Sequence, residues 1–289
     1  MRVLITGRTG QLGRELLQAT PPRWEVTAFS STELDIRDAG AVQATVAEIG
    51  PQVIVNAAAY TAVDKAEKEP GVAYATNSQG VANLAGAAGN AGARLIHIST
   101  DFVFDGGKSS PYLSTDTPNP TCVYGASKLA GEEQLQSILP GNYLILRTAW
   151  VYSSHGYNFV RTMLRLMRER DQLQVVADQV GTPTWAGGLA QAIWLLAEQA
   201  ALSGIFHWTD AGVASWYDFA VAIQEEALEL GLLDRKTIIL PIRTQDYPTP
   251  ARRPSYSVLD KTATWQALGH SAPHWRVNLR KMLRELRED

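Results

Sequence analysis

The sequence has little of what marks secreted, membrane-bound or nucleic-acid-binding proteins. Its 289 residues contain a single cysteine, Cys122, so an intrachain disulfide is excluded and a reducing compartment is favoured. No apolar run approaches the roughly 20 residues of a membrane-spanning helix, and the N-terminal residues lack a signal-peptide pattern. The formal net charge of -3 gives no reason to expect nucleic acid or an anionic membrane as a partner. We therefore predict a cytoplasmic protein that binds neither.

The first half of the chain alternates between short apolar runs and helical patterns. Hydrophobic residues make up 45% of the chain, enough to bury a large core. The expected strands are 2–6, 25–29, 53–60, 94–99 and 143–148. Because strand–helix alternation requires parallel strands with helices on both faces, the sequence predicts an α/β fold with a Rossmann-type doubly wound parallel sheet.

The alternation loosens after residue 150. We therefore expect two domains, a number that suits the length of the chain. Residues 1–150 would form a dinucleotide-binding Rossmann domain, and residues 151–289 would mainly form a smaller, partly interleaved substrate domain. Later segments near 174–200 and 237–258 are expected to return to the first domain.

A glycine-rich turn follows the first expected strand. After Thr6 the chain reads Gly7-Arg-Thr-Gly10-Gln-Leu-Gly13 and continues as a helical pattern. Glycines permit a tight turn and let the backbone approach a pyrophosphate, whose charge the helix N-terminus favours. The spacing is G-x-x-G-x-x-G and not the commoner G-x-G-x-x-G, but strand, turn and helix together predict a dinucleotide site.

The end of the second expected strand bears on which dinucleotide binds. NAD-preferring sites often carry an acid there that binds the ribose 2′-hydroxyl. This chain has Ser30, with Arg8 nearby in the glycine loop. A 2′-phosphate would then meet a cation and no carboxylate, so we expect NADPH, with NADH as the alternative.

Three neighbouring features of the sequence each have two possible interpretations. Asp35 could lie at the adenine edge of a cofactor or cap the following helix. The small residues of Asn56-Ala-Ala-Ala-Tyr60 could leave room for a cofactor or simply pack. A hydroxyl at the end of the 94–99 strand could bind a substrate oxygen or a tyrosine. His97, within that strand, is interpreted as a core histidine with its hydrogen bonds satisfied.

The segment Tyr124-Gly-Ala-Ser-Lys128 places a phenol and an ammonium on one face of an expected helix. A free tyrosine titrates near pH ~10, and a neighbouring cation favours the phenolate. We therefore expect Lys128 to lower the pKa of Tyr124, so that the phenol can exchange a proton with a substrate oxygen. The spacing alone is common on solvated helix faces, but beside a dinucleotide site it predicts carbonyl reduction or alcohol oxidation.

Two arginines, Arg252 and Arg253, lie among three prolines of the segment 248–254. Proline restricts the backbone, and arginine suits bidentate phosphate recognition. The segment could hold the diphosphate of a substrate or be a surface loop with solvated charges. His270 and His274 have metal-like spacing, but Pro273 between them argues against a continuous helix and a metal site.

Segments spread over nearly the whole chain resemble the extended short-chain dehydrogenase/reductases, and among them the dTDP-4-dehydrorhamnose reductase family. The segments are Gly7–Gly13, Asn56–Asp64, Ser99–Phe104, Tyr124–Lys128, Arg147–Tyr152, Asn158–Phe159, Asp178–Thr184 and Thr249–Pro254. The resemblance implies that hydride from NADPH reduces the C4 ketone of dTDP-4-dehydro-L-rhamnose, the last step of dTDP-L-rhamnose biosynthesis.

The resemblance also implies roles for individual residues. Tyr124 would protonate the developing alkoxide, Lys128 would bind the nicotinamide ribose, and Thr100 would supply a third catalytic hydroxyl. The candidate substrate contacts are Thr100, Asp101, Trp150, Asn158, Arg252 and Arg253. The candidate cofactor contacts, besides Tyr124 and Lys128, are Gly7, Gly10, Gln11, Leu12, Gly13, Asp35, Ile36, Ala59, Tyr60 and Thr61.

Some members of the family form a dimer around Mg²⁺, using a glutamate that matches Glu15 and an acidic pair on a later helix. Here that helix begins Ala186-Gly-Gly-Leu-Ala-Gln191 and has no acidic pair. Hard cations need oxygen ligands, usually carboxylates. We therefore predict no metal site and a monomer or weak homodimer.

Two other functions stay open. A nucleotide-sugar epimerase or another 4-ketosugar reductase would keep the glycine loop and the Tyr124–Lys128 pair, but an epimerase would retain a tightly bound oxidised cofactor. A non-catalytic regulatory subunit, like the β subunit of methionine adenosyltransferase, could keep the same motifs and bind a partner enzyme.

Overall fold

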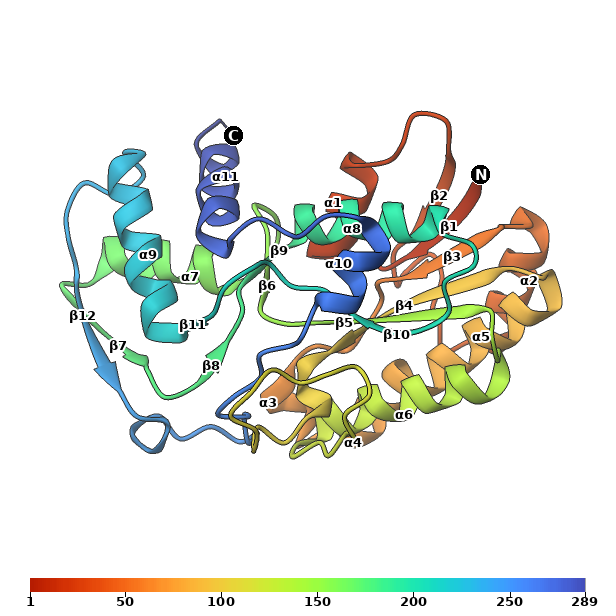
Figure 1. Ribbon diagram of the computed structural model, residues 1–289, viewed down its shortest axis with the longest axis horizontal. Helices are drawn as coiled ribbons and strands as arrows, with labels where there is room; N and C mark the ends of the chain where they lie inside the picture. The colour runs from red at the N-terminus through yellow and green to blue at the C-terminus, as the bar shows by residue number, and fades with distance from the viewer. Residues whose placement is uncertain (289) are drawn as a thin grey trace.

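A six-stranded parallel sheet forms the centre of the N-terminal half (Figure 1). This computed structural model describes residues 1–288. The strand order is β10-β5-β4-β3-β1-β2, and every neighbouring pair is parallel. The strands are β1 (Arg2–Thr6), β2 (Glu25–Phe29), β3 (Val53–Asn56), β4 (Arg94–Thr100), β5 (Tyr143–Thr148) and β10 (Gly204–His207). The predicted parallel α/β fold is confirmed, and the order reverses beside β1, where such sheets bind ligands.

Helices cover both faces of this sheet. Helices α1 (Gln11–Gln18) and α8 (Ala186–Glu198) pack against one face, where they meet strand residues such as Val3 and Ile5. The other face carries α2 (Ala39–Ile49), α5 (Gly80–Ala91) and α6 (Val123–Ile138), which meet residues such as Leu4 and Ile54. Because successive strand residues point to opposite faces, a strand buried on both sides is mostly apolar along its length.

The helical region between β3 and β4 is divided into several pieces. It consists of α4 (Pro70–Tyr74), a π-helical turn η1 (Ala75–Gln79) and α5, with the short helix α3 (Val63–Ala66) before it. The turn holds Asn77, which is buried. Its amide accepts from the backbone N–H of Tyr60 at 2.8 Å and donates to the carbonyl of Tyr60 at 3.0 Å. The turn therefore fixes the loop that follows β3.

The C-terminal half surrounds a second apolar cluster, which includes Met163, Met167, Phe219, Ile223 and Leu279. Its short strands form separate two-stranded pairs: β12 with β7, β11 with β8, and β6 with β9. The strands are β6 (Val151–Tyr152), β7 (Gln172–Val176), β8 (Val180–Gly181), β9 (Thr184–Trp185), β11 (Ala214–Ser215) and β12 (Ile238–Ile242). The helices of this half are α7 (Phe159–Glu169), α9 (Trp216–Glu229), α10 (Thr262–Leu268) and α11 (Trp275–Glu288), besides the 3-10 turn η3 (Thr244–Asp246). The other 3-10 turn, η2 (Asp101–Val103), directly follows β4 in the N-terminal half.

The later segments return to the N-terminal half in part. Helix α8 packs on the central sheet, whereas β12 pairs with β7 outside that sheet. Farther along, Arg253 forms an ion pair with Asp64, and Leu259 forms an isolated bridge with Tyr112. The domain limits remain a prediction.

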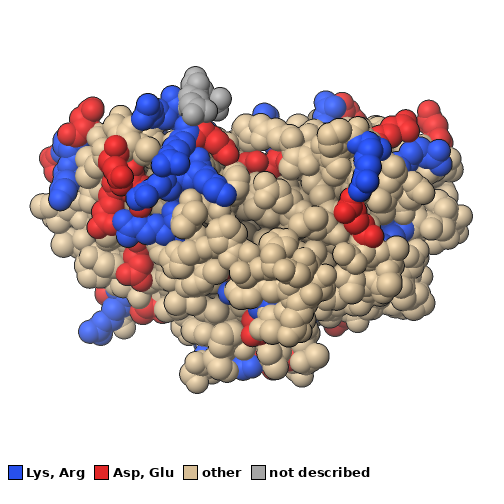
Figure 2. Space-filling model, turned by 45° about the horizontal axis from the view of Figure 1, so that its top comes forward, with Lys and Arg blue, Asp and Glu red and all other residues tan. Residues whose placement is uncertain are grey.

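Charged side chains of both signs mix where α9 and α11 meet (Figure 2). Arg276 binds Glu225 and Glu226, and Arg280 binds Glu226 and Glu229. Among residues 1–288, no helix combines the length and apolar character needed to cross a membrane.

Candidate active site

The glycine loop has a geometry that only glycine allows at two positions. Gly7 has φ +79°, and a Cβ there would lie 2.7 Å from the backbone nitrogen of Ala58. A Cβ on Gly13 would lie 2.2 Å from the carbonyl oxygen of Gly7. Helix α1 begins directly after Gly10, which makes no side-chain cap. The first N–H groups of α1 therefore remain available for an anion such as a pyrophosphate.

A cavity of about 380 Å³ opens beside this loop. Six predicted cofactor residues line it: Gly7, Gly10, Asp35, Ile36, Ala59 and Tyr60. Of the others, Gln11, Leu12 and Gly13 form the first turn of α1, and Thr61 is exposed next to Tyr60. Helix α2 is capped by Asp38, which accepts from the N–H of Ala41 at 3.0 Å. Asp35 is thus not the cap, and it faces the cavity paired with Arg37 at 2.6 Å.

One expectation about the 2′-phosphate is wrong, because a carboxylate does lie at the end of β2. Glu33 accepts from the backbone nitrogen of Ser30 at 2.8 Å and from its hydroxyl at 2.7 Å. Its other oxygen pairs with Arg8 at 2.8 Å. These hydrogen bonds from Ser30, with the nearby Arg8, lower the pKa of Glu33, so the carboxylate stays ionised. The charge of Arg8 is therefore already shared with Glu33.

The predicted pair Tyr124 and Lys128 lies on α6, as expected. The start of this helix packs tightly on the turn after β4, since a Cβ on Gly125 would lie 2.1 Å from the carbonyl oxygen of Phe102. The Tyr124 ring meets the Phe102 ring edge-on at 5.5 Å. This packing brings the phenol near the Thr100 hydroxyl at the carboxyl end of β4, which acts to lower the pKa of the phenol.

The prediction that Lys128 lowers the pKa of Tyr124 is wrong for this structure. Burial raises the pKa of Tyr124 well above its ordinary value, and the hydrogen bond with Thr100 opposes this only in part. Burial also lowers the pKa of Lys128 to about 8, opposed by the charge of Glu132. Lys128 donates to the carbonyl of Ile98 at 2.7 Å. Desolvation thus outweighs the attraction expected from spacing.

Asp101, the residue after Thr100, is a buried carboxyl group. Its Oδ1 accepts from the Thr100 hydroxyl at 3.1 Å. Burial raises the pKa of Asp101 to about 6, against the effect of hydrogen bonds from Ser257 and Thr100. Near neutral pH the group therefore lies close to its titration point and can exchange between acceptor and donor.

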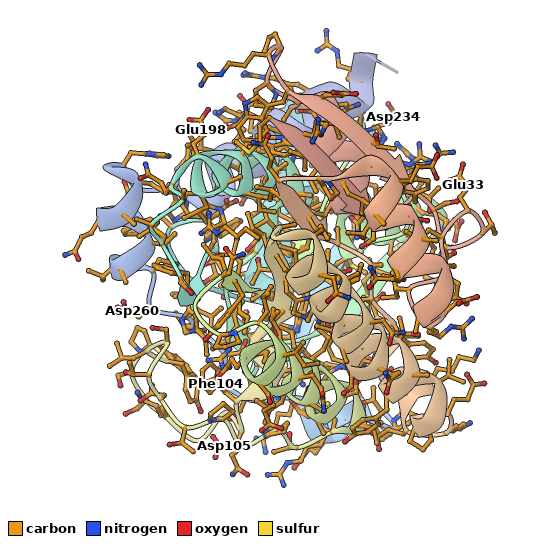
Figure 3. All side chains as sticks on the ribbon, turned by 90° about the vertical axis from the view of Figure 1, so that its right-hand side faces the viewer. Glu33, Phe104, Asp105, Glu198, Asp234 and Asp260 are labelled. Carbon is orange, nitrogen blue, oxygen red and sulfur yellow. The ribbon has the colours of Figure 1, made fainter. Side chains whose placement is uncertain are left out.

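A buried ion pair supports the strands beneath the site. Arg147 on β5 binds Glu132 on α6 at 2.6 Å, with side chains 1% and 0% exposed. The hydroxyl of Ser99 donates to the same carboxylate, so it is held away from the catalytic pair. The Arg147 guanidinium lies 5.1 Å from the ring centre of Phe104. Phe104 begins the exposed loop that leaves β4, as Figure 3 shows with Asp105 beside it.

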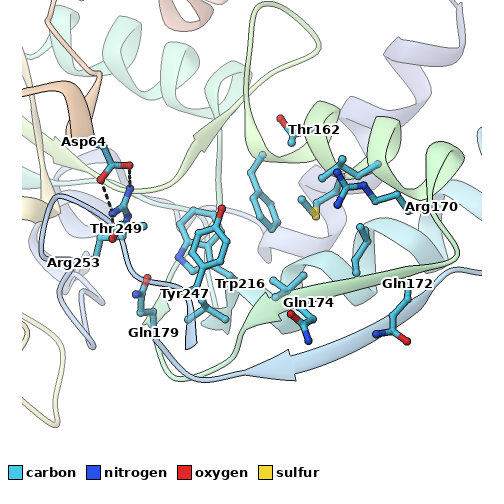
Figure 4. A pocket seen from close by; sticks show the side chains of 16 residues that line it. Asp64, Thr162, Arg170, Gln172, Gln174, Gln179, Trp216, Tyr247, Thr249 and Arg253 are labelled. Carbon is cyan, nitrogen blue, oxygen red and sulfur yellow. Dashed lines mark hydrogen bonds and ion pairs between the residues drawn. The ribbon is translucent and has the colours of Figure 1, made fainter. Parts of the chain in front are cut away.

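A larger cavity of about 800 Å³ opens in the C-terminal half (Figure 4). Trp216 and Phe159 form an aromatic part of its wall, 4.7 Å apart between ring centres. Trp150 stacks on Trp216 at 3.5 Å and has a φ of +49°. A left-handed backbone is unusual for a bulky residue and points to a site that needs the ring in this place. Of the predicted substrate residues, Arg253 lines the cavity itself.

Asn158 and Arg253 have structural partners within the fold, and Arg252 lies outside the cavity. Asn158 caps α7 and also donates to Gln11 at 2.9 Å, which ties α7 to the glycine loop. Arg253 pairs with Asp64 at 2.7 Å. Arg252 is exposed and does not line the cavity.

The residues considered for a metal do not come together. Glu15 is buried and accepts from the Ser153 hydroxyl at 2.6 Å. His270 bonds to the carbonyl of Leu268, and His274 to the N–H of Arg276. Within residues 1–288, no group of His, Cys, Asp or Glu has the geometry of a metal site.

Sequence reasoning missed three polar residues of the site. Glu33 follows Ser30 with the spacing of a capping box, and this signal could have revealed it. No local sequence pattern marks Asn77 as a residue of the site. Asn56 was read as part of a small-residue loop, yet its amide lies 3.0 Å from Nδ1 of His97.

The chain matches the family described as "RmlD substrate binding domain" over residues 1–288. The dTDP-4-dehydrorhamnose reductase of Aggregatibacter actinomycetemcomitans is 45% identical, over 97% of this chain and 98% of the relative. The chain belongs to the dTDP-4-dehydrorhamnose reductase family. The resemblance drawn from the sequence segments is thus confirmed.

Solved structures of this family superpose closely on the chain. The enzyme from Clostridium acetobutylicum gives a TM-score of 0.93 at 40% identity, covering 99% of this chain and all (100%) of the other. The enzyme from Bacillus anthracis, solved in complex with NADP, gives 0.92 at 38% identity, covering 98% and 99%. A UDP-glucose 4-epimerase from Thermotoga maritima, 20% identical, shares the fold.

Proposed function

We propose that this protein reduces the C4 ketone of dTDP-4-dehydro-L-rhamnose with NADPH and releases dTDP-L-rhamnose. The observation that carries the proposal is the placement of Tyr124. Its phenol is held against Thr100 at the carboxyl end of β4, on the helix that also carries Lys128. The family supplies the identity of the substrate.

The dinucleotide would lie along the glycine loop and the 380 Å³ cavity. The glycine geometry fits it, because a Cβ on Gly7 or Gly13 would fill the space that the backbone needs to turn. Ile36, Ala59 and Tyr60 would line the adenosine end. When bound, NADPH supplies the hydride for the ketone carbon.

Tyr124 would deliver the proton to the ketone oxygen. A general acid must carry its proton at working pH, and burial keeps the Tyr124 phenol protonated by raising its pKa. The Thr100 hydroxyl, which donates to Asp101 in this structure, would turn to donate to the phenolate that remains after transfer and so stabilise it. Solvent then returns the proton. The raised pKa therefore suits the direction of ketone reduction.

The nucleotide sugar would occupy the larger cavity, with its sugar toward Thr100 and Asp101. The aromatic wall of Trp216 and Phe159 offers flat apolar surface for a base or sugar ring. Arg253 provides a cation at the edge of this cavity, already oriented by Asp64. We assign Trp150, Asn158 and Arg252 to the substrate side as well. Cytoplasmic location and a monomer or weak homodimer remain predictions.

The proposal is tested by following nicotinamide absorbance with the purified protein and dTDP-4-dehydro-L-rhamnose. NADPH and NADH are supplied in parallel, and oxidation is expected with NADPH. The ratio of the oxidation rates of NADPH and NADH shows which of the two cofactors the site with the Arg8–Glu33 pair prefers. Tight binding of both cofactors without oxidation of either would refute the reductase.

Two features of the purified protein separate the alternatives. An epimerase would carry oxidised cofactor through purification and interconvert sugars without net oxidation. A regulatory subunit would bind dinucleotide, show no turnover and co-purify with a partner synthetase.

A further inference from the structure

A chain of buried polar groups runs beneath the catalytic helix and ends at Lys128. The Thr6 hydroxyl donates to Oδ1 of Asn56 at 2.7 Å. The amide nitrogen of Asn56 lies 3.0 Å from Nδ1 of His97. Nε2 of His97 lies 3.2 Å from Nζ of Lys128, which also donates to the carbonyl of Ile98 at 2.7 Å. All four side chains are at most 1% exposed.

The orientation of the Asn56 side-chain amide is fixed by a neighbouring backbone N–H group, which can donate a hydrogen bond but cannot accept one. The backbone N–H of Ala58 points at Oδ1 of Asn56 at 3.1 Å. A backbone N–H can only donate, so the atom it meets must be the amide oxygen. The amide NH₂ of Asn56 therefore faces His97.

This orientation determines the tautomer of His97. Because Nδ1 meets an amide donor, Nδ1 must be the acceptor nitrogen of the ring. Burial is the main cause that lowers the pKa of His97 well below its ordinary value, so the ring is neutral even if Lys128 carries no charge. A neutral imidazole carries one proton, which must then be on Nε2.

The proton on Nε2 points at Lys128. An ammonium group has three donors and no lone pair, so an ammonium opposite an N–H would place two donors 3.2 Å apart. A neutral amine removes the conflict, because it accepts from Nε2 and still donates to Ile98. A buried donor that faces another donor is destabilising, which favours the amine.

The charged groups around Lys128 do not reverse this preference. Glu132, one helical turn further along α6, favours the ammonium. Its carboxylate, however, is bound by both Nε and Nη2 of Arg147 on β5. Tyr124, one turn earlier, is neutral because of its raised pKa. His97 is the titratable group in direct contact.

We propose that Asn56 and His97 are positioning residues that favour the neutral amine of Lys128 over its ammonium form. Lys128 then titrates closer to neutral pH and exchanges between amine and ammonium, instead of holding a permanent positive charge. This agrees with the burial of Tyr124, which is not compensated by a neighbouring cation. The inference concerns the protein alone, so it can fail while the proposed reductase activity stands.

The first test is NMR of the unliganded protein. With ¹⁵N-labelled histidine, the five histidines are few enough to resolve, and a His97→Gln variant assigns the His97 signals. We expect the proton of His97 on Nε2. With ¹³Cε-labelled lysine, assigned by Lys128→Met, we expect Lys128 to titrate at or below about pH 8. A proton on Nδ1, or titration of Lys128 near the ordinary value of ~10.4, would overturn the proposal.

The second test reverses one donor. Asn56→Asp keeps an oxygen for Thr6 and Ala58 but presents an acceptor to Nδ1. We expect the His97 proton to move to Nδ1 and the titration of Lys128 to rise by about one pH unit or more. Asn142→Asp makes the same chemical change where an amide donates to Ala93, and it should move neither signal.

Each outcome of the second test counts. Unchanged His97 and Lys128 signals in Asn56→Asp at pH 8, where a carboxylate is ionised, contradict the proposal. Equal shifts in Asn142→Asp would show a general charge effect and contradict it too. If Asn56→Asp does not fold, the measurements on the unmodified protein still decide.

Discussion

The two halves of the molecule differ in the kinds of side chains that they bury. The N-terminal half encloses charged and polar side chains within its sheet, including Lys128, His97 and the Arg147–Glu132 pair. The C-terminal half is built around an apolar and aromatic cluster. Its ion pairs lie at the surface, as in Arg276–Glu225 at 44% and 54% exposed, or join the buried carboxylate of Glu226 to half-exposed arginines. A rigid parallel sheet can hold polar groups at fixed distances, as proton transfer requires. Aromatic walls instead shape a cavity.

The largest expected effect comes from breaking the buried ion pair. Glu132→Gln leaves the Arg147 guanidinium buried without a counter-charge. Removing one partner of a buried pair typically costs about 3–5 kcal/mol, and we expect a loss of that size in the free energy of unfolding. Chemical denaturation followed by circular dichroism measures it.

The matched control lies in the other half. Glu225→Gln removes a partner of Arg276 where both side chains are solvated. Exposed pairs contribute about 0–1 kcal/mol, so unfolding should change little. Equal losses in the two variants would mean that the halves do not differ in how they use charge.

The next effect is on turnover. Tyr124→Phe removes the proton donor and leaves the ring against Phe102. General acid catalysis contributes about 10²-fold or more, so kcat should fall by at least about that factor while NADPH still binds. Stopped-flow absorbance gives kcat, and fluorescence titration gives the dissociation constant. Near-normal turnover would remove Tyr124 from the role of acid.

The contrast between the halves also explains which features could be predicted from the sequence. The inner strands β1, β3, β4 and β5 each contain a short apolar run, because both their faces are buried, whereas the edge strand β2 is only partly buried. The two-residue strands β6, β8 and β9 are too short to leave a period in the sequence. The C-terminal helices α7, α9 and α11 do carry a recognisable apolar pattern, since a helix keeps a local period in either half.

The candidate site also has features that the sequence predicts and features that it does not. The glycine loop and the Tyr124–Lys128 spacing are local patterns, and the structure places both near the carboxyl edge of the sheet. The pKa of Tyr124 was predicted in the wrong direction, because burial depends on the whole fold and spacing does not reveal it. The contact of Lys128 with His97 joins residues 31 positions apart, a distance at which the sequence carries no signal.

A smaller effect is expected from the aromatic wall. Trp216→Ala removes the ring that stacks on Trp150 at 3.5 Å. Aromatic pairs contribute about 0.5–1.5 kcal/mol beyond the area that they bury, so we expect KM for the nucleotide sugar to rise several-fold with kcat nearly unchanged. Steady-state kinetics measures both. A fall in kcat with unchanged KM would instead place Trp216 in the chemistry.

The smallest effect is expected at Arg252, in the proline-rich segment. Arg253 is committed to Asp64, whereas Arg252 makes no hydrogen bond or ion pair within residues 1–288. If Arg252 binds the diphosphate, it does so equally in the ground and transition states. Arg252→Ala should then raise KM by up to about tenfold and spare kcat. Arg235→Ala, which removes an exposed arginine paired with Asp171, should leave KM unchanged. Equal KM values for both variants and the unmodified protein would make the Arg252 segment a surface loop and leave Arg253 as the cation at the cavity.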